Sequence, residues 1–250
     1  MEFGMSASPL VVGNTVVVMP GGANGQSVVA YDRESRRRVW TALDDRATYS
    51  SPMLVTLAGV RQILVFTATR LVGLSPQNGQ LLWELPWRTV NQASQPLIAG
   101  PDRVFISSGS GTDAAMLQVA AGADGQLTAR ELWRTTRMNN NFSSSVLHDG
   151  FIYGLDGSIL ACVDASTGEL KWKGGRYGTG QLLLASGHLI VLTEQGELAL
   201  VRADPTAHQE ITRFPAMEGK TWNHPAMSDG ILLIRNTEEM AAFDLTKGAK

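Results

Sequence analysis

The chain has 250 residues, with 21 Lys and Arg, 23 Asp and Glu, and a formal net charge of −2. This balance gives no electrostatic basis for binding nucleic acid or an anionic membrane, so we expect neither as a partner. The single cysteine, Cys162, excludes an intramolecular disulfide and a Cys-x-x-Cys metal site. No apolar run approaches the roughly 20 residues of a membrane-spanning helix, and the length suits one all-β domain.

The first residues stand apart from the pattern that follows. Met1-Glu2-Phe3-Gly4-Met5 lacks the basic start and apolar core of a secretory signal. We therefore expect residues 1–7 to be a short leader of cloning origin, or disordered, ahead of one domain at 8–250. With no signal peptide, the sequence leaves the location of this chain in the cell undecided.

A turn followed by a tryptophan recurs along the domain. The first copy is Tyr31-Asp32-Arg33-Glu34-Ser35 before Trp40, and the clearest is Asp164-Ala165-Ser166-Thr167-Gly168 before Trp172. Asp, Ser and Thr side chains can hydrogen-bond the turn backbone, and Gly adopts a positive φ without steric cost. Two copies between these lead to Trp83 and Trp133, and a copy after them leads to Phe214. The last copy ends within the turn that follows Phe243. A spacing on the order of 40–50 residues is that of propeller blades.

A second signal lies half a period away and marks the start of a short apolar strand. These starts are Ser8-Pro9, Ser51-Pro52, Gln95-Pro96, Ser144-Ser145, Gln181-Leu182 and His224-Pro225. Each period then predicts four antiparallel strands, A to D, with the tryptophan on strand D. The sequence therefore predicts an all-β fold, a β-propeller of six four-stranded blades whose tryptophans pack between blades.

The expected blades, in chain order, span 8–42, 50–87, 94–135, 143–174 and 180–214, with the sixth beginning at 223. The sixth ends after its third strand and lacks the outer one. Such an edge leaves backbone N–H and C=O groups unpaired. We expect residues 1–6 to patch it, or a second copy of the chain to add to it as a homo-oligomer.

The pattern Asp-x-x-Thr-Gly-x-x-x-Trp, from Asp164 to Trp172, resembles the pyrroloquinoline-quinone-type (PQQ-like) propeller repeat. The resemblance extends over about residues 8–248. The family includes quinoprotein alcohol dehydrogenases and non-enzymatic outer-membrane assembly lipoproteins. Its members are commonly exported and often have eight blades. The resemblance thus implies a truncated or shortened propeller, derived from an exported or periplasmic parent.

The segments that lead into the innermost strands are expected to meet at one mouth of the central channel, where propellers usually bind ligands. This predicted ring is polar, neutral and edged by aromatic residues. Its expected ligand-binding residues are Tyr49, Ser50, Asn91, Gln95, Asn141, Ser143, Thr179, Trp222 and Asn223. The leading interpretation is a scaffold that binds a small molecule or a peptide there.

The first alternative is a hydrolase of esters or phosphoesters. His224 is the catalytic candidate because the pKa of an unperturbed histidine lies near neutrality, and a nearby serine would be the nucleophile. The asparagines of the ring suggest calcium or another divalent metal, but a hard cation also prefers a carboxylate. Asp44 and Asp45 are the nearest, and no metal ligands are assigned.

The third hypothesis, a quinone-dependent dehydrogenase, comes from the resemblance. Quinoprotein dehydrogenases combine a catalytic Asp, a calcium ion, a stacking Trp and, in several members, a disulfide of adjacent cysteines. Trp222 could stack on a quinone, but one cysteine cannot form that disulfide and no Asp is evident in the ring. PQQ is therefore not the expected cofactor, and the sequence leaves open whether the protein is an enzyme.

Overall fold

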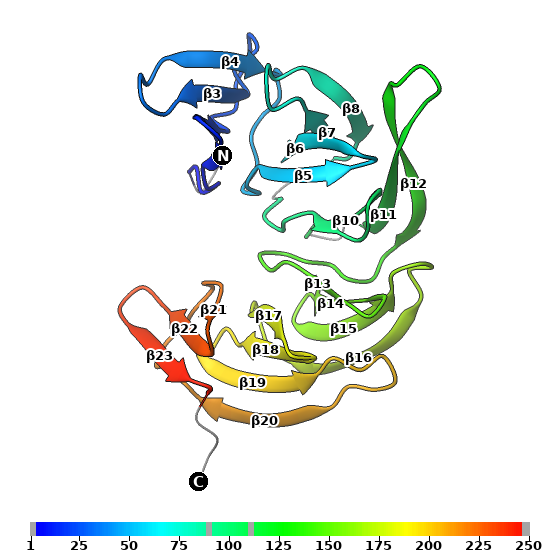
Figure 1. Ribbon diagram of the computed structural model, residues 1–250. Helices are drawn as coiled ribbons and strands as arrows, with labels where there is room; N and C mark the ends of the chain where they lie inside the picture. The colour runs from blue at the N-terminus through cyan, green and yellow to red at the C-terminus, as the bar shows by residue number, and fades with distance from the viewer. Residues whose placement is uncertain (1–3, 89–91, 110–112, 247–250) are drawn as a thin grey trace. The chain divides into compact units, whose positions relative to one another are not determined.

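The computed structural model describes residues 4–88, 92–109 and 113–246, and within them the ordered elements are all β-strands (Figure 1). The described part of the chain holds no helix with the length and apolarity to cross a membrane. The strands fall into two compact units, Met1–Arg134 and Thr135–Lys250, which are described separately below.

Unit 1 contains three four-stranded antiparallel sheets, each built from strands consecutive in sequence. Blade 1 consists of β1 (Leu10–Val12), β2 (Thr15–Val18), β3 (Val28–Asp32) and β4 (Arg38–Ala42). Blade 2 consists of β5 (Met53–Leu57), β6 (Val60–Phe66), β7 (Arg70–Leu74) and β8 (Leu81–Pro86). Blade 3 consists of β9 (Leu97–Ile98), β10 (Arg103–Ser107), β11 (Ala114–Ala121) and β12 (Leu127–Thr135), whose last residue falls in unit 2.

Unit 2 continues the repeat, and its last sheet is one strand shorter in the described residues. Blade 4 consists of β13 (Val146–His148), β14 (Phe151–Asp156), β15 (Ile159–Asp164) and β16 (Leu170–Arg176). Blade 5 consists of β17 (Gln181–Ala185), β18 (His188–Leu192), β19 (Glu197–Arg202) and β20 (Glu210–Pro215). Blade 6 consists of β21 (Ala226–Ser228), β22 (Ile231–Arg235) and β23 (Met240–Asp244).

Six antiparallel sheets in a regular repeat confirm the predicted fold, a six-bladed β-propeller whose last blade lacks its outer strand in the described residues. The turns between the third and fourth strands form as their residue types predict. The Asp164 carboxylate accepts the N–H of Ser166 at 2.8 Å and that of Thr167 at 3.1 Å, and Gly168 has a φ of 75°. Hydrogen bonds from Ser166 lower the pKa of Asp164, so the turn favours the ionised carboxylate.

Tryptophans of the fourth strands anchor neighbouring blades, as expected. Trp40 of blade 1 is buried and donates from its indole Nε1 to the Pro76 carbonyl in the turn of blade 2, at 3.2 Å. Trp172 of blade 4 donates in the same way to Asp204 of blade 5, at 2.7 Å. Trp83 is different, since its indole donates to Gln62 within its own blade. The repeated indole therefore serves both packing and hydrogen bonding.

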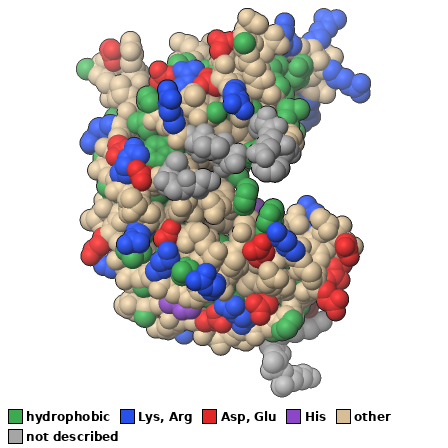
Figure 2. Space-filling model, turned by 180° about the vertical axis from the view of Figure 1, so that it is seen from behind, with side chains coloured by type: hydrophobic (Ala, Val, Ile, Leu, Met, Phe, Trp, Pro, Cys, Tyr) green, Lys and Arg blue, Asp and Glu red, His purple; other side chains and the backbone are tan. Residues whose placement is uncertain are grey.

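Apolar cores fill the spaces between consecutive blades of each unit. In unit 1 one core joins blades 1 and 2 and another joins blades 2 and 3. In unit 2 one core joins blades 4 and 5 and another joins blades 5 and 6. Cys162 is fully buried in the core that joins blades 4 and 5, and burial raises its pKa to about 12, which is typical of an inert core thiol. Charges of both signs are interspersed over the face shown in Figure 2.

Candidate functional site

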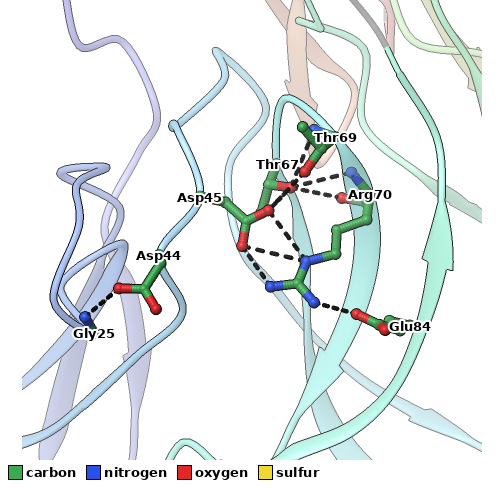
Figure 3. A network of polar contacts seen from close by, with 7 residues as sticks. All are labelled: Gly25, Asp44, Asp45, Thr67, Thr69, Arg70 and Glu84. Atoms are coloured by element: carbon green, nitrogen blue, oxygen red, sulfur yellow. Dashed lines mark hydrogen bonds and ion pairs between the residues drawn. The ribbon is translucent and has the colours of Figure 1, made fainter.

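In blades 2 to 6 the segment that enters the blade lies against the turn between that blade's second and third strands. Asp45, which precedes blade 2, illustrates this arrangement (Figure 3). Its carboxylate accepts hydrogen bonds from the hydroxyls of Thr67 at 3.1 Å and Thr69 at 2.7 Å, and it forms an ion pair with Arg70 at 2.7 Å. Arg70 also pairs with Glu84 on β8. The strand-start segment is thereby fixed to its own blade.

These contacts bear on the carboxylates considered for a metal. Burial disfavours the charge on Asp45, but hydrogen bonds from Arg70 and Thr69 outweigh it and lower the pKa. Both oxygens of Asp45 are engaged by Arg70, and Asp44 accepts the N–H of Gly25 at 2.6 Å. Among the described residues, no three His, Cys, Asp or Glu side chains are grouped as metal ligands.

In unit 1 the starts of the three blades are linked by side chains. The Oγ of Ser51 accepts the N–H of Ser8 at 2.8 Å. The side-chain amide of Gln95 is oriented so that its nitrogen and its oxygen both hydrogen-bond Ser51. The nitrogen donates to the Ser51 carbonyl at 3.0 Å, and the oxygen accepts the Ser51 N–H at 2.7 Å. The predicted residues Ser50, fully buried, and Tyr49, half-buried, adjoin this link. Asn91 lies outside the described residues.

In unit 2 the starts of blades 4, 5 and 6 are brought together by Gln181, whose side chain is almost fully buried. Its Nε2 donates to the Phe142 carbonyl at 3.0 Å and to the Trp222 carbonyl at 3.1 Å. The two aromatic rings stack, with centroids 5.4 Å apart and planes at 15°. Phe142 is 40% exposed and Trp222 is 45% exposed. Gln181 thus holds two exposed aromatic side chains side by side.

Glu194, in the turn between β18 and β19, holds the indole of Trp222. It accepts the indole N–H of Trp222 at 3.1 Å, the backbone N–H of Thr179 at 3.1 Å and the ammonium of Lys220 at 3.2 Å. Lys220 also lies over the Trp222 ring, 3.8 Å from its centroid. The Thr179 hydrogen bond, with those of Trp222 and Lys220, lowers the pKa of Glu194. We call Phe142, Gln181, Glu194, Lys220 and Trp222 the aromatic-pair site.

The other predicted residues of unit 2 surround this site in sequence. Asn141 is half-buried and Ser143 is buried. Asn223 is half-buried, and its N–H donates to the Thr221 hydroxyl at 3.2 Å. His224 is exposed, and desolvation by the surrounding protein lowers its pKa. Its catalytic role stays a prediction, as does ligand binding by the residues of the ring.

Sequence reasoning did not single out Glu194 or Lys220. Glu194 is 28 residues from its partner Trp222 and belongs to another blade, so no local pattern connects them. The sequence alone shows Glu194 only as an acidic residue two positions before Gly196, in an expected turn. The repeat predicts that this turn lies at the same end of the blade as the strand starts, because successive strands are antiparallel.

A second polar cluster joins the end of blade 4 to the fourth strand of blade 5. The Tyr177 hydroxyl donates to Glu210 at 2.8 Å and lies 2.9 Å from Nε2 of His208. Arg213 bonds Glu210 at 2.7 Å and stacks on the Tyr177 ring at 4.7 Å. Burial raises the pKa of Tyr177 and lowers that of His208. These groups satisfy one another, which fits a structural role.

The blades and the turn-and-tryptophan repeat define this chain as a PQQ-like β-propeller protein. The sequence model of the family described as outer membrane protein assembly factor BamB, which has the PQQ-type repeat, matches residues 2–174. The match covers well over half of the chain, so the chain belongs to this family. A search of curated proteins found no significant match.

Solved structures with a similar fold come from natural and designed proteins. BamB from Moraxella catarrhalis is 14% identical with a TM-score of 0.55, and the match covers 92% of this chain and 81% of that one. The computationally designed Ika8 protein is 12% identical with a TM-score of 0.59, over 91% of this chain and 66% of that one. A protein of unknown function from Desulfotomaculum acetoxidans DSM 771 is 13% identical with a TM-score of 0.63, over 96% and 82%. At these identities the likeness concerns the fold.

Proposed function

We propose that this protein is a non-enzymatic scaffold that binds a segment of another protein at the aromatic-pair site. The observation that carries the proposal is the exposed stack of Phe142 on Trp222. Tryptophan and other aromatic residues are enriched among the residues that dominate protein–protein binding, since each buries a large area on contact. The other members of the site hold this pair in position.

The site is organised before any partner arrives. Trp222 is held at its indole N–H by Glu194, at its carbonyl by Gln181 and over its ring face by Lys220. A side chain already confined to one rotamer loses little conformational entropy on binding, so more of the contact energy appears as affinity. Lys220 and Glu194 place one charge of each sign beside the rings, which suits a polypeptide carrying both apolar and polar groups.

The family supports the same class of function. Its description names an outer membrane protein assembly factor, and a solved BamB shares the fold. An assembly function requires contact with other proteins, and an exposed aromatic pair is suited to such contact. We accordingly propose an exported parent that acts in the periplasm or at the outer membrane.

Selection of displayed random peptides on the purified chain tests this function. A selected peptide is expected to bind Trp222→Ala and Phe142→Ala at least about tenfold more weakly than the unaltered chain, because either change removes half of the stack. Tyr31→Ala is the matched control, since Tyr31 is an exposed aromatic of unit 1. Selected peptides that bind both site variants undiminished would contradict the proposal.

The two enzymatic hypotheses are distinguished from this role by activity. Chromogenic esters and phosphotriesters, with and without chelator, test the hydrolase. Quinone addition followed by dye reduction tests the dehydrogenase. Turnover lost in His224→Ala would favour acid–base catalysis, and turnover lost on chelation would favour a metal.

A further inference from the structure

The fourth-strand tryptophan of blade 2 turns back to its own blade, whereas those of blades 1 and 4 reach the next one. Trp40 donates at 3.2 Å to a carbonyl in the turn between the third and fourth strands of blade 2. Trp172 donates at 2.7 Å to a carbonyl in the same turn of blade 5. The indole of Trp83 donates instead to Gln62 on β6. The turn of blade 3 therefore lacks the indole hydrogen bond that the turns of blades 2 and 5 receive.

The residue that pairs with each tryptophan on the third strand accounts for this difference. The tryptophans of blades 1 and 4 pair with Ala30 and Cys162, which both carry a Cβ. Trp83 pairs with Gly73, and a Cβ added there would collide with the indole. Because Gly73 has no side chain, Trp83 can lie against its own sheet.

Gln62 holds Trp83 in this orientation. It is fully buried, and its Nε2 donates to the carbonyl oxygens of Leu57 at 3.2 Å and Val60 at 3.1 Å. These two hydrogen bonds fix the amide, so that its Oε1 accepts the indole N–H. A buried indole N–H requires an acceptor, and Gln62 supplies one inside the blade.

The turn of blade 3 is also shorter than the turn of blade 2. The Gly122 N–H donates to the Gln126 carbonyl at 2.8 Å, whereas in blade 2 the Ser75 N–H donates to the Gln80 carbonyl at 2.8 Å. The hydrogen bond in blade 3 thus encloses one residue fewer. The shorter turn has less chain with which to reach the indole of the preceding blade.

A recess lies between blades 2 and 3 where these two features meet. Its volume is about 420 Å³. The walls are formed by Val60, Leu81 and Leu82 of blade 2 and by Gly125, Gln126 and Leu127 of blade 3. Leu81 is 40% exposed, so a bound molecule would remove apolar surface from water.

Gly125 relates this recess to the place that an indole occupies at the boundary of blades 1 and 2. Gly79 and Gly125 each stand directly before the glutamine that closes their turn, with φ values of 73° and 78°. A Cβ on Gly79 would lie 2.5 Å from Cε3 of Trp40, whereas a Cβ on Gly125 would meet no atom within 4 Å. The first boundary therefore shows which group fits against such a turn.

We propose that the recess binds a small molecule with a planar two-ring aromatic group and a ring N–H, of the indole class. The rings pack between Leu81 and Leu127, and the N–H donates to a carbonyl of the blade 3 turn, as Trp40 does at the turn of blade 2. The volume lies within the range of about 300–1,000 Å³ that is typical of small-molecule sites. All the walls belong to unit 1, so the site does not depend on the aromatic-pair site of unit 2.

Titration of the ¹⁵N-labelled chain with indole, followed by nuclear magnetic resonance of the backbone amides, tests the proposal. We expect saturable shifts at Gly125, Gln126 and Leu127, with a dissociation constant on the order of 1 mM or lower. Benzofuran has the same shape with an oxygen in place of the N–H, and it should bind at least about fivefold more weakly. Equal affinity for the two compounds, or saturable shifts at the aromatic-pair site alone, would overturn the proposal.

A pair of variants locates the binding. Leu81→Asp places a carboxylate on an exposed apolar wall of the recess and should weaken indole binding at least about tenfold. Val39→Asp makes the same change at an exposed apolar residue on the fourth strand of blade 1 and should leave binding unchanged. Equal affinity of the two variants for indole would overturn the proposal.

Gly73→Ala tests the origin of the recess. The added Cβ should move Trp83 away from its own sheet and towards blade 3, so that its indole fills the recess and the affinity for added indole falls at least about tenfold. Unchanged affinity in a folded Gly73→Ala chain would overturn the link between Trp83 and the recess. The dispersion of the amide signals reports folding, and the Leu81→Asp and Val39→Asp pair decides the site if this variant does not fold.

Discussion

The indole Nε1 of Trp172 donates a hydrogen bond across the blade boundary to the carbonyl oxygen of Asp204, at 2.7 Å. The same tryptophan closes the row that crosses blade 4 and contacts His208 edge-on, with ring centroids 5.5 Å apart. One side chain therefore belongs to two blades. The unit's cohesion depends on such shared residues as much as on the sheets themselves.

Trp172→Phe tests the hydrogen-bonding part of this contact. Phenylalanine retains most of the apolar contact but leaves the Asp204 carbonyl without its donor, so we expect a loss of about 1–2 kcal/mol in the free energy of unfolding. Trp172→Ala adds a cavity and should cost about 3–5 kcal/mol. Urea denaturation measures both. Equal losses would mean that the indole N–H contributes and the ring does not.

Gly79→Ala tests the close approach of the blade 2 turn to Trp40. Gly79 has a φ of 73°, and a Cβ there would lie 2.5 Å from Cε3 of Trp40. Gly59 has a φ of 76° and open space around it, so Gly59→Ala carries the backbone strain alone. We expect Gly79→Ala to lose about 1–3 kcal/mol more than this control in the free energy of unfolding. Equal midpoints for the two variants would argue against the contact.

The ion pair of Asp45 with Arg70 predicts a pH dependence. The folded state lowers the Asp45 pKa, so its contribution to stability is present above the unfolded value of about 3.9 and is lost as pH falls through the folded pKa. Asp45→Asn should lower the free energy of unfolding at pH 7 by about 1–3 kcal/mol. The difference from the unaltered chain should shrink towards pH 2.

A matched control for Asp45 is the exposed pair of Asp113 with Arg134. Asp113→Asn should change the free energy of unfolding by less than about 1 kcal/mol, because solvent screens that pair. A pH-independent effect of Asp45→Asn would indicate that its oxygens matter as hydrogen-bond acceptors rather than as a charge.

His224 should titrate below the ordinary histidine pKa of about 6.5, because desolvation favours its neutral form. Nuclear magnetic resonance of the imidazole Hε1 measures this directly, with His224→Gln assigning the signal. Since the folded pKa is lowered, the group's contribution to stability is full above about 6.5 and declines as pH falls towards the folded pKa. A midpoint above 6.5 would show that a neighbouring negative charge dominates.

The fold could be predicted because its signals are local and repeat. Asp164, Thr167 and Gly168 form their turn through contacts within five residues, and each copy brings its tryptophan a few residues later. That blade 6 has three strands in the described residues was also predicted from the repeat pattern. The small residue opposite the tryptophan was not singled out, because strand pairing is needed to show which residues share a row.

The candidate site could be predicted from the sequence only in part. The sequence by itself determined the number of blades, the turns and the segments that begin each one, because a hydrogen-bonded turn and an alternating strand depend on neighbouring residues. Tertiary structure alone decided that Gln181 joins Phe142 to Trp222 across 39 and 41 residues and that Glu194 orders the pair. Such contacts depend on how blades pack, and no local preference of the chain encodes which side chains then meet.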